Sequence, residues 1–211
     1  MLKDIHTHHL SCRPEKDLLS VCFQDADSAE FKQAVHLAAG IHPWYVTDDD
    51  FQTQTEWVKD IVHDSRVLAI GEGGLDKCCT TPFELQEKAF RFQIELAEVH
   101  RLPLIIHCVR CGAELIRLKK EYCPQSPWII HGFRGKPQQA TEYLRHGFYL
   151  SFSERYSEEA LRITPVDRFF IETDESKVPV DEFYQRAARI REIPLSVLED
   201  SVFENINRLF Y

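Results

Sequence analysis

The chain has 211 residues, of which 44% are hydrophobic and 11% aromatic, which is enough to bury one large core, so we expect a single domain over residues 1–211. A formal net charge of −9 argues against a protein that coats nucleic acid nonspecifically, since lysine and arginine supply most of that binding. No apolar run is long enough to cross a bilayer and no signal-peptide pattern opens the chain, so we expect a cytoplasmic protein without membrane contact or an obligate protein partner.

Short apolar runs alternate along the chain with polar or amphipathic segments, as they do in parallel β/α proteins. The predicted strands cover residues 2–5, 18–23, 35–41, 67–70, 104–106, 128–130, 148–152 and 169–171. Eight strands are the number that a closed parallel barrel needs. We therefore predict an α/β protein with a TIM-type (β/α) barrel.

The clearest helix follows the fourth run. Thr81 and Pro82 give it a start with proline in the first turn, and Phe83, Phe90 and Ile94 then recur on one face at helical spacing. Further helices are predicted at residues 49–62, 112–122, 136–145, 180–191 and 195–209.

The connection between the first two strands leaves little room for a crossover helix. It has only about a dozen residues and includes Pro14. We expect an irregular barrel whose first helix is short or absent, and a seven-stranded or distorted barrel is the alternative.

Polar residues stand at or just beyond the carboxyl ends of these runs, where a β/α barrel carries its chemistry. His6 and His8 follow the first run, and because alternate strand residues face the same side, both imidazoles can reach one metal ion. An exposed polar terminus is the ordinary alternative for this pair. His107 and His131 each end a wholly apolar run, and their matching positions favour joint metal ligation.

Two carboxylates occupy equivalent positions. Glu72 follows the fourth run in a glycine-rich turn, where it could bridge two cations, although an isolated glutamate is more often a surface acid. Asp174 follows the last run, where it could hold a metal and accept a proton from water. Glu172 shares its strand face and is the competitor, but Asp174 lies nearer the mouth of the barrel.

The remaining candidates lie on loops at the same end. His42 and Trp44 follow the third run and could face a substrate, although Trp44 could merely pack its loop. Arg110, Arg134 and Lys136 follow the fifth and sixth runs and are candidate phosphate clamps, although exposed charges on loops often have no partner.

In this order and spacing the motifs resemble the TatD family of metal-dependent deoxyribonucleases, which are hydrolases built on a TIM-type barrel. The resemblance is carried by residues 6–8, 40–43, 69–76, 102–107, 130–135, 147–152, 172–174 and 205–210. It implies two divalent ions, either zinc, manganese or magnesium. It places His6, His8, Glu72 and Asp174 around one ion, and Glu72, His107 and His131 around the other.

The loops around the site depart from the family's pattern. The region between His8 and Gly40 is shorter than usual, and Lys77-Cys78-Cys79 replaces the usual aromatic and basic residues. Arg110 stands one residue later than the arginine that commonly follows the fifth strand. The hydrolytic chemistry is therefore better supported than a nucleic-acid substrate.

We predict a hydrolase that cleaves a phosphodiester, in DNA or in a small substrate, with a hydroxide activated by two metal ions. Asp174 would take a proton, Glu72 would fix the separation of the metals, and His42 and Arg134 would face phosphate oxygens. Two alternatives stay open. One is an amidohydrolase-like enzyme acting on a small amide, ester or phosphate, which the acidic composition mildly favours, and the other is a non-catalytic barrel.

Overall fold

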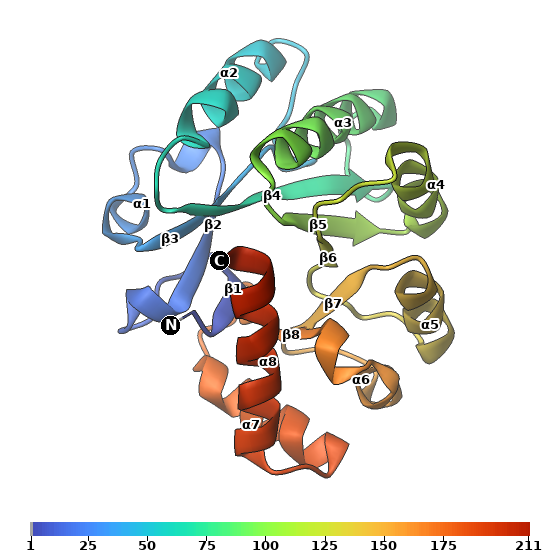
Figure 1. The fold of residues 1–211 in the computed structure, drawn as a ribbon. Helices are drawn as coiled ribbons and strands as arrows, with labels where there is room; N and C mark the ends of the chain where they lie inside the picture. Colours follow the sequence, from blue (N-terminus) through green and yellow to red (C-terminus); the bar gives the residue numbers. More distant parts are fainter. Residues whose placement is uncertain (1) are drawn as a thin grey trace.

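The computed structural model describes residues 2–211, whose eight strands form one parallel sheet with the order β1 to β8 (Figure 1). The strands are β1 (Asp4–Thr7), β2 (Asp17–Val21), β3 (His36–Ala39), β4 (Val67–Asp76), β5 (Leu104–Val109), β6 (Trp128–Ile130), β7 (Tyr149–Phe152) and β8 (Phe169–Ile171). A parallel bridge between Thr7 and Asp174 brings the end of the sheet back to β1. The sheet is a nearly closed barrel, so the TIM-type prediction is confirmed and the seven-stranded alternative is wrong.

Helices lie around the outside of this barrel (Figure 1). They are α1 (Ala29–Gln33), α2 (Phe51–Ile61), α3 (Phe83–His100), α4 (Gly112–Tyr122), α5 (Pro137–Arg145), α6 (Glu158–Ile163), α7 (Val180–Arg191) and α8 (Leu195–Phe210). All of the predicted helices are present. The two that the sequence did not reveal, α1 and α6, are too short for a periodic pattern and begin at serine caps, Ser28 and Ser157.

The first crossover helix is absent, as predicted. Between β1 and β2 the structure has only the 3-10 turn Pro14–Lys16. The carboxylate of Asp17 ties this short connection down, because it accepts hydrogen bonds from the backbone nitrogen of Ser11 at 2.6 Å and from its hydroxyl at 3.1 Å.

Strand β4 continues well past the predicted residues 67–70, so Glu72 lies within the strand and not in a turn after it. Glycines make this possible, because β4 passes very close to its neighbours. A Cβ atom at Gly74 would lie 2.0 Å from the carbonyl oxygen of His107, and one at Gly73 would lie 2.5 Å from Oε1 of Gln93. Glycine normally weakens a strand, and the sequence pattern therefore predicted an end too early.

Buried hydrogen bonds and ion pairs hold β1 in the barrel. The carboxylate of Asp4 accepts hydrogen bonds from Thr173, at 2.6 Å from the hydroxyl and 3.1 Å from the backbone nitrogen. Lys3, which is 6% exposed, forms ion pairs with Asp181 of α7 and Glu199 of α8. The first strand is thus held by residues that come after β8 in the chain.

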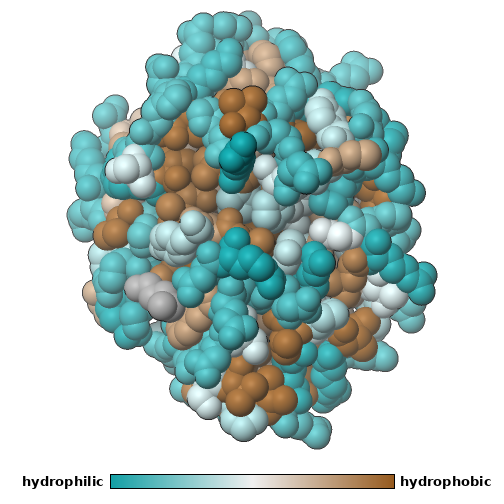
Figure 2. All heavy atoms as spheres, in the orientation of Figure 1, coloured by the Kyte–Doolittle hydropathy of each residue, from teal (hydrophilic) through white to brown (hydrophobic). Residues whose placement is uncertain are grey.

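Hydrophilic residues cover most of the face of the molecule shown in Figure 2, and hydrophobic residues lie between them in patches. Within residues 2–211, no helix combines the length and the apolar character that a bilayer-spanning segment needs.

Replacing Thr173 with valine tests the closure between β8 and β1. The change keeps the shape of the side chain but removes the hydroxyl that donates to the buried Asp4 carboxylate, so we expect the free energy of unfolding to fall by about 1–3 kcal/mol. Urea denaturation of the metal-free protein measures this difference. Thr53→Val, on the exposed face of α2, is the matched control, and an equal effect of the two substitutions would contradict the closing role.

Candidate metal centre

A pocket of about 820 Å³ opens at the carboxyl ends of the strands. Its walls include most of the predicted metal ligands, namely His8, Glu72, His107, His131 and Asp174. His6 lies beneath them and is fully buried. The structure thus brings all six predicted ligands together, although their role as ligands remains a prediction.

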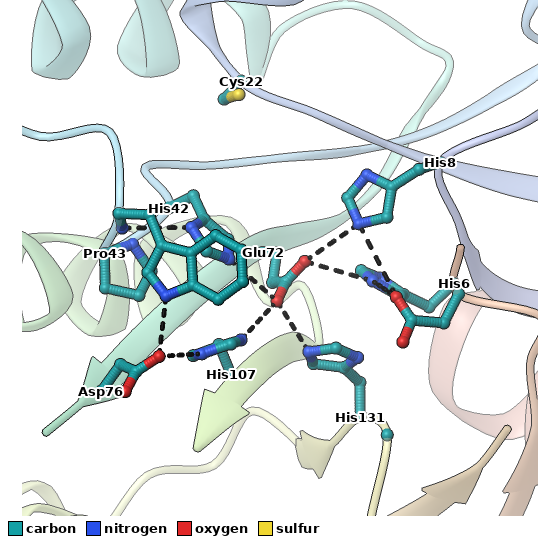
Figure 3. A network of polar contacts seen from close by, with 12 residues as sticks. His6, His8, Cys22, His42, Pro43, Glu72, Asp76, His107 and His131 are labelled. Carbon is teal, nitrogen blue, oxygen red and sulfur yellow. Dashed lines mark hydrogen bonds and ion pairs between the residues drawn. The ribbon is translucent and has the colours of Figure 1, made fainter. Parts of the chain in front are cut away.

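The carboxylate of Glu72 lies at the centre of this cluster, and imidazoles from other strands converge on it (Figure 3). Its Oε1 atom lies 2.7 Å from Nε2 of His131 and 2.9 Å from Nδ1 of His107. A third imidazole, that of His42, has its Nε2 atom 3.2 Å from the same oxygen. These contacts form the side of the cluster that the third, fifth and sixth strands supply.

The other oxygen of Glu72 faces the first strand. Its Oε2 atom lies 3.2 Å from Nε2 of His6 and 3.3 Å from Nε2 of His8. Oδ1 of Asp174 lies 3.9 Å from both of these nitrogens. The two oxygens of Glu72 therefore face different sets of imidazoles, although His6 and His131 also lie close to each other, with ring centroids 4.2 Å apart. The assignment to two ions that the family resemblance implies stays a prediction.

The surroundings of Glu72 contain no permanently charged partner. Within the described part of the chain, every ion pair that Glu72 makes is with a histidine. Neither ring nitrogen of the buried His6 has a hydrogen-bond partner in good geometry. Unpaired nitrogens beside a buried carboxylate suit a bound cation, and a mixed imidazole and carboxylate set suits zinc or manganese.

Burial and charge shift the pKa values of this cluster in opposite directions. Burial raises the pKa of Glu72, but the imidazoles of His131 and His6 outweigh it and hold that pKa well below its usual range. Burial lowers the pKa of His131, yet the charge of Glu72 and a bond to Glu172 raise it well above the usual value. Burial also lowers the pKa of His42, against the effect of its bond to Glu72. A metal ion bound at His131 would therefore compete with a proton.

Asp174 and Glu172 differ in exposure, although an oxygen of each lies within 4.8 Å of the other and of a nitrogen of His131. Asp174 lines the pocket, has the left-handed backbone angle φ of 57°, and lies 3.6 Å from Nη2 of Arg134. Glu172 is fully buried and accepts a hydrogen bond from the backbone nitrogen of Gly132 at 2.6 Å. Its Oε1 atom also lies 3.3 Å from Nδ1 of His131. Asp174 is therefore the carboxylate that can meet a substrate, whereas Glu172 supports His131 from behind.

The predicted substrate residues lie at unequal distances from the centre. His42 is nearer than predicted, because it contacts Glu72 directly and could share an ion with Glu72 and His107. Trp44, Arg110 and Arg134 line the pocket. Lys136 precedes α5, is exposed and is not among the residues that line the pocket, so its contact with a substrate stays a prediction. A sequence shows that a charge follows a strand but does not show which way its side chain turns.

Asp76 is a residue of the site that the sequence analysis missed. It is 3% exposed, and its Oδ2 atom lies 3.0 Å from Nε2 of His107 and 2.7 Å from Nε1 of Trp44. Burial raises the pKa of Asp76, but its hydrogen bonds with Trp44 and His107 lower it by more, so the pKa lies below its usual value. Residues four apart in a strand share a face, so continuing β4 through its glycines would have placed Asp76 on the same face as Glu72.

A parallel eight-stranded barrel with histidines and carboxylates gathered at the carboxyl ends of its strands defines a metal-dependent hydrolase. Residues 24–211 match the family model for TatD related DNase. The chain belongs to this family, and the resemblance carried by its motifs is confirmed.

Individual relatives agree with this assignment. An uncharacterized metal-dependent hydrolase of Bacillus subtilis, YabD, is 29% identical over 198 residues, which cover 83% of this chain and 77% of that protein. The 3'-5' ssDNA/RNA exonuclease TatD of Cronobacter turicensis is 33% identical over 147 residues, which cover 64% of this chain and 55% of the exonuclease. The crystal structure of the Escherichia coli TatD homologue YjjV has the same fold, with a TM-score of 0.79 at 21% identity over 92% of this chain and 85% of its own.

The raised pKa of His131 predicts that the metal affinity depends on pH. Below that pKa a proton occupies the nitrogen that a metal needs, so we expect the affinity for Zn²⁺ to increase as the pH rises above about 6.5, the ordinary histidine value. Calorimetric titration of metal-stripped protein in two buffers of different ionisation enthalpy measures the affinity and the protons released. His63→Gln, on the surface, should leave this dependence unchanged, and an affinity that is flat across this range would refute the prediction.

Proposed function

We propose that this chain hydrolyses phosphodiester bonds of single-stranded nucleic acid at a binuclear metal centre built around Glu72. The observation that carries the proposal is the arrangement of two ligand groups on opposite oxygens of one buried carboxylate. Divalent ions held at such a centre polarise a phosphoryl oxygen and lower the pKa of water, which is the chemistry that phosphodiester hydrolysis needs.

Each ion would have its own protein ligands in addition to the shared carboxylate. One ion would be held by His6, His8 and Asp174, and the other by His107 and His131, with Glu72 contacting both. Zinc and manganese suit this donor set better than magnesium, which prefers oxygen ligands.

The side chains around the centre would bind the phosphate and move a proton. In the reaction, a water oxygen attacks phosphorus and gives up a proton, and the bond from phosphorus to one ester oxygen breaks. That oxygen takes up a proton from solvent and leaves as a hydroxyl group. Asp174 faces the pocket, and within residues 2–211 its one charged partner beyond the histidines is Arg134, so it is placed to accept the proton of the attacking water. His42 and Arg134 lie beside the same space and would donate to phosphate oxygens.

The walls of the pocket favour a single strand as the substrate. Trp44 and Tyr45 are 52% and 49% exposed, and both residues line the pocket that Arg110 and Arg134 also line. Aromatic faces stack unpaired bases, and arginines bind the phosphates between them. With a net charge of −9 the chain is poorly suited to an extended duplex, and the relative named as a ssDNA/RNA exonuclease supports the same choice.

Glu72→Gln and His107→Ala test the metal centre. Each removes a proposed ligand, and since a metal ion contributes several kcal/mol of charge stabilisation, we expect the rate to fall on the order of 10³-fold. The assay follows a fluorescent single-stranded oligonucleotide with Mn²⁺, Mg²⁺ or Zn²⁺ added back, and Glu56→Gln on α2 is the control. Full metal-dependent activity in either variant would refute the ligand assignment. Cleavage of amides or lactones without cleavage of phosphodiesters would favour the amidohydrolase alternative.

Arg134→Ala and Lys136→Ala distinguish a residue inside the pocket from a neighbour outside it. We expect Arg134→Ala to raise the KM for an oligonucleotide about tenfold, the effect of losing one charge-assisted hydrogen bond that water partly screens. Lys136→Ala should leave KM nearly unchanged, because Lys136 does not line the pocket. Steady-state kinetics on the same oligonucleotide measure both KM values. Equal changes in KM would show that both side chains act only through the overall electrostatic potential of the protein and not through a specific contact.

A further inference from the structure

The histidine His107 is held from both sides. Its Nδ1 atom lies 2.9 Å from Oε1 of Glu72, and its Nε2 atom lies 3.0 Å from Oδ2 of Asp76 (Figure 3). A neutral imidazole carries one proton, and an ionised carboxylate only accepts hydrogen bonds. With Nε2 donating to Asp76, the free electron pair of His107 is on Nδ1 and faces the proposed metal centre.

Asp76 itself is fixed by several hydrogen bonds besides the contact with His107. Nε1 of Trp44 donates to its Oδ2 at 2.7 Å, and the backbone nitrogen of Cys78 donates to its Oδ1 at 2.6 Å. The side chain of Gln86, from α3, accepts a hydrogen bond from the backbone nitrogen of Asp76 at 2.7 Å and donates one to its carbonyl oxygen at 3.0 Å. Asp76 can therefore hold His107 in one orientation.

Among residues 2–211, none of the side-chain groups that could hold an ion includes Asp76. Its Oδ2 atom contacts the far nitrogen of the His107 ring, away from Glu72. A contact of this kind acts on a metal through the histidine, by setting its tautomer and increasing its basicity.

We propose that Asp76 is a positioning residue, which fixes the tautomer of His107 for metal binding. Trp44 donates to the same carboxylate oxygen of Asp76 and thereby links the rim of the pocket to His107. The proposal rests on the proposed function. Trp44 contributes to it because its half-exposed ring lies edge-on to His107, with the ring centroids 5.4 Å apart. We therefore expect a change at His107 to alter the fluorescence of the Trp44 indole.

The first arm of the test measures zinc binding to metal-stripped protein by competition with a chelator. The side-chain amide of an Asp76→Asn variant can donate to Nε2 of His107, which moves the ring proton to Nδ1, facing Glu72. We expect the affinity for one of two zinc ions to fall between about tenfold and a hundredfold, while the other ion binds as before. Asp76→Glu, which keeps a carboxylate acceptor, should recover part of the affinity, and Glu114→Gln, which only loses an exposed ion pair with Lys77, should behave as wild type.

The second arm separates positioning from a merely structural role. If Asp76 acts through His107, adding Asp76→Asn to His107→Ala should cause no further loss of zinc affinity. Zinc should also change the fluorescence of the protein, and Trp44→Phe should abolish that change whereas Trp57→Phe should keep it. This measurement needs no substitution at Asp76, so it tests the link even where the asparagine variant does not fold.

If the wild-type chain binds zinc and cleaves phosphodiesters, two results would overturn this proposal and leave the proposed function standing. One is a wild-type zinc affinity in Asp76→Asn, and the other is a loss of zinc affinity in the double variant that equals the sum of the losses in Asp76→Asn and His107→Ala. A zinc-dependent fluorescence change that survives Trp44→Phe would remove Trp44 from the proposal. A wild-type chain that takes up no zinc would overturn the proposed function and this proposal with it.

Discussion

The structure depends on how one buried carboxylate is compensated. Glu72 is 4% exposed, and an isolated carboxylate in such a place costs far more free energy than a folded domain can spare. Its charged partners here are histidines from several strands, in place of arginine or lysine. A barrel suits this arrangement because its strand ends surround one point, so each strand needs to deliver only one or two side chains.

Small details of the backbone place those side chains at the same height. The glycines of β4 let that strand run against β5 without side chains between them, which brings Glu72 beside His107. On the other side of the barrel, Asp4 binds Thr173 and thereby sets β1 against β8, so that His6, His8 and Asp174 meet. Interactions that have no part in the chemistry thus determine the geometry of the candidate centre.

Much of this could be predicted because barrel strands are buried on both faces, and a histidine that ends an apolar run stands out. That logic found the barrel and the six clustered side chains. It failed where the local pattern was broken, as in β4, whose glycines hid the continuation to Asp76. It also could not give the direction of a side chain, since His42 turns toward Glu72 and Lys136 is not among the residues that line the pocket. Short helices such as α1 are set by a cap and tertiary packing, which leave little trace in periodicity.

The closure of the barrel also orders events during synthesis. The bond from Thr173 to Asp4 joins residues 169 positions apart, and Asp174 pairs with the backbone of His6 and His8. A ribosome therefore releases β1 long before its partner β8 exists, and one edge of the strand stays without a partner until then. Contacts of such long range also slow folding, since a large loop must close first. The cluster of His6, His8 and Asp174 is consequently completed only after β8 has emerged, so the candidate centre cannot assemble until most of the chain has been made.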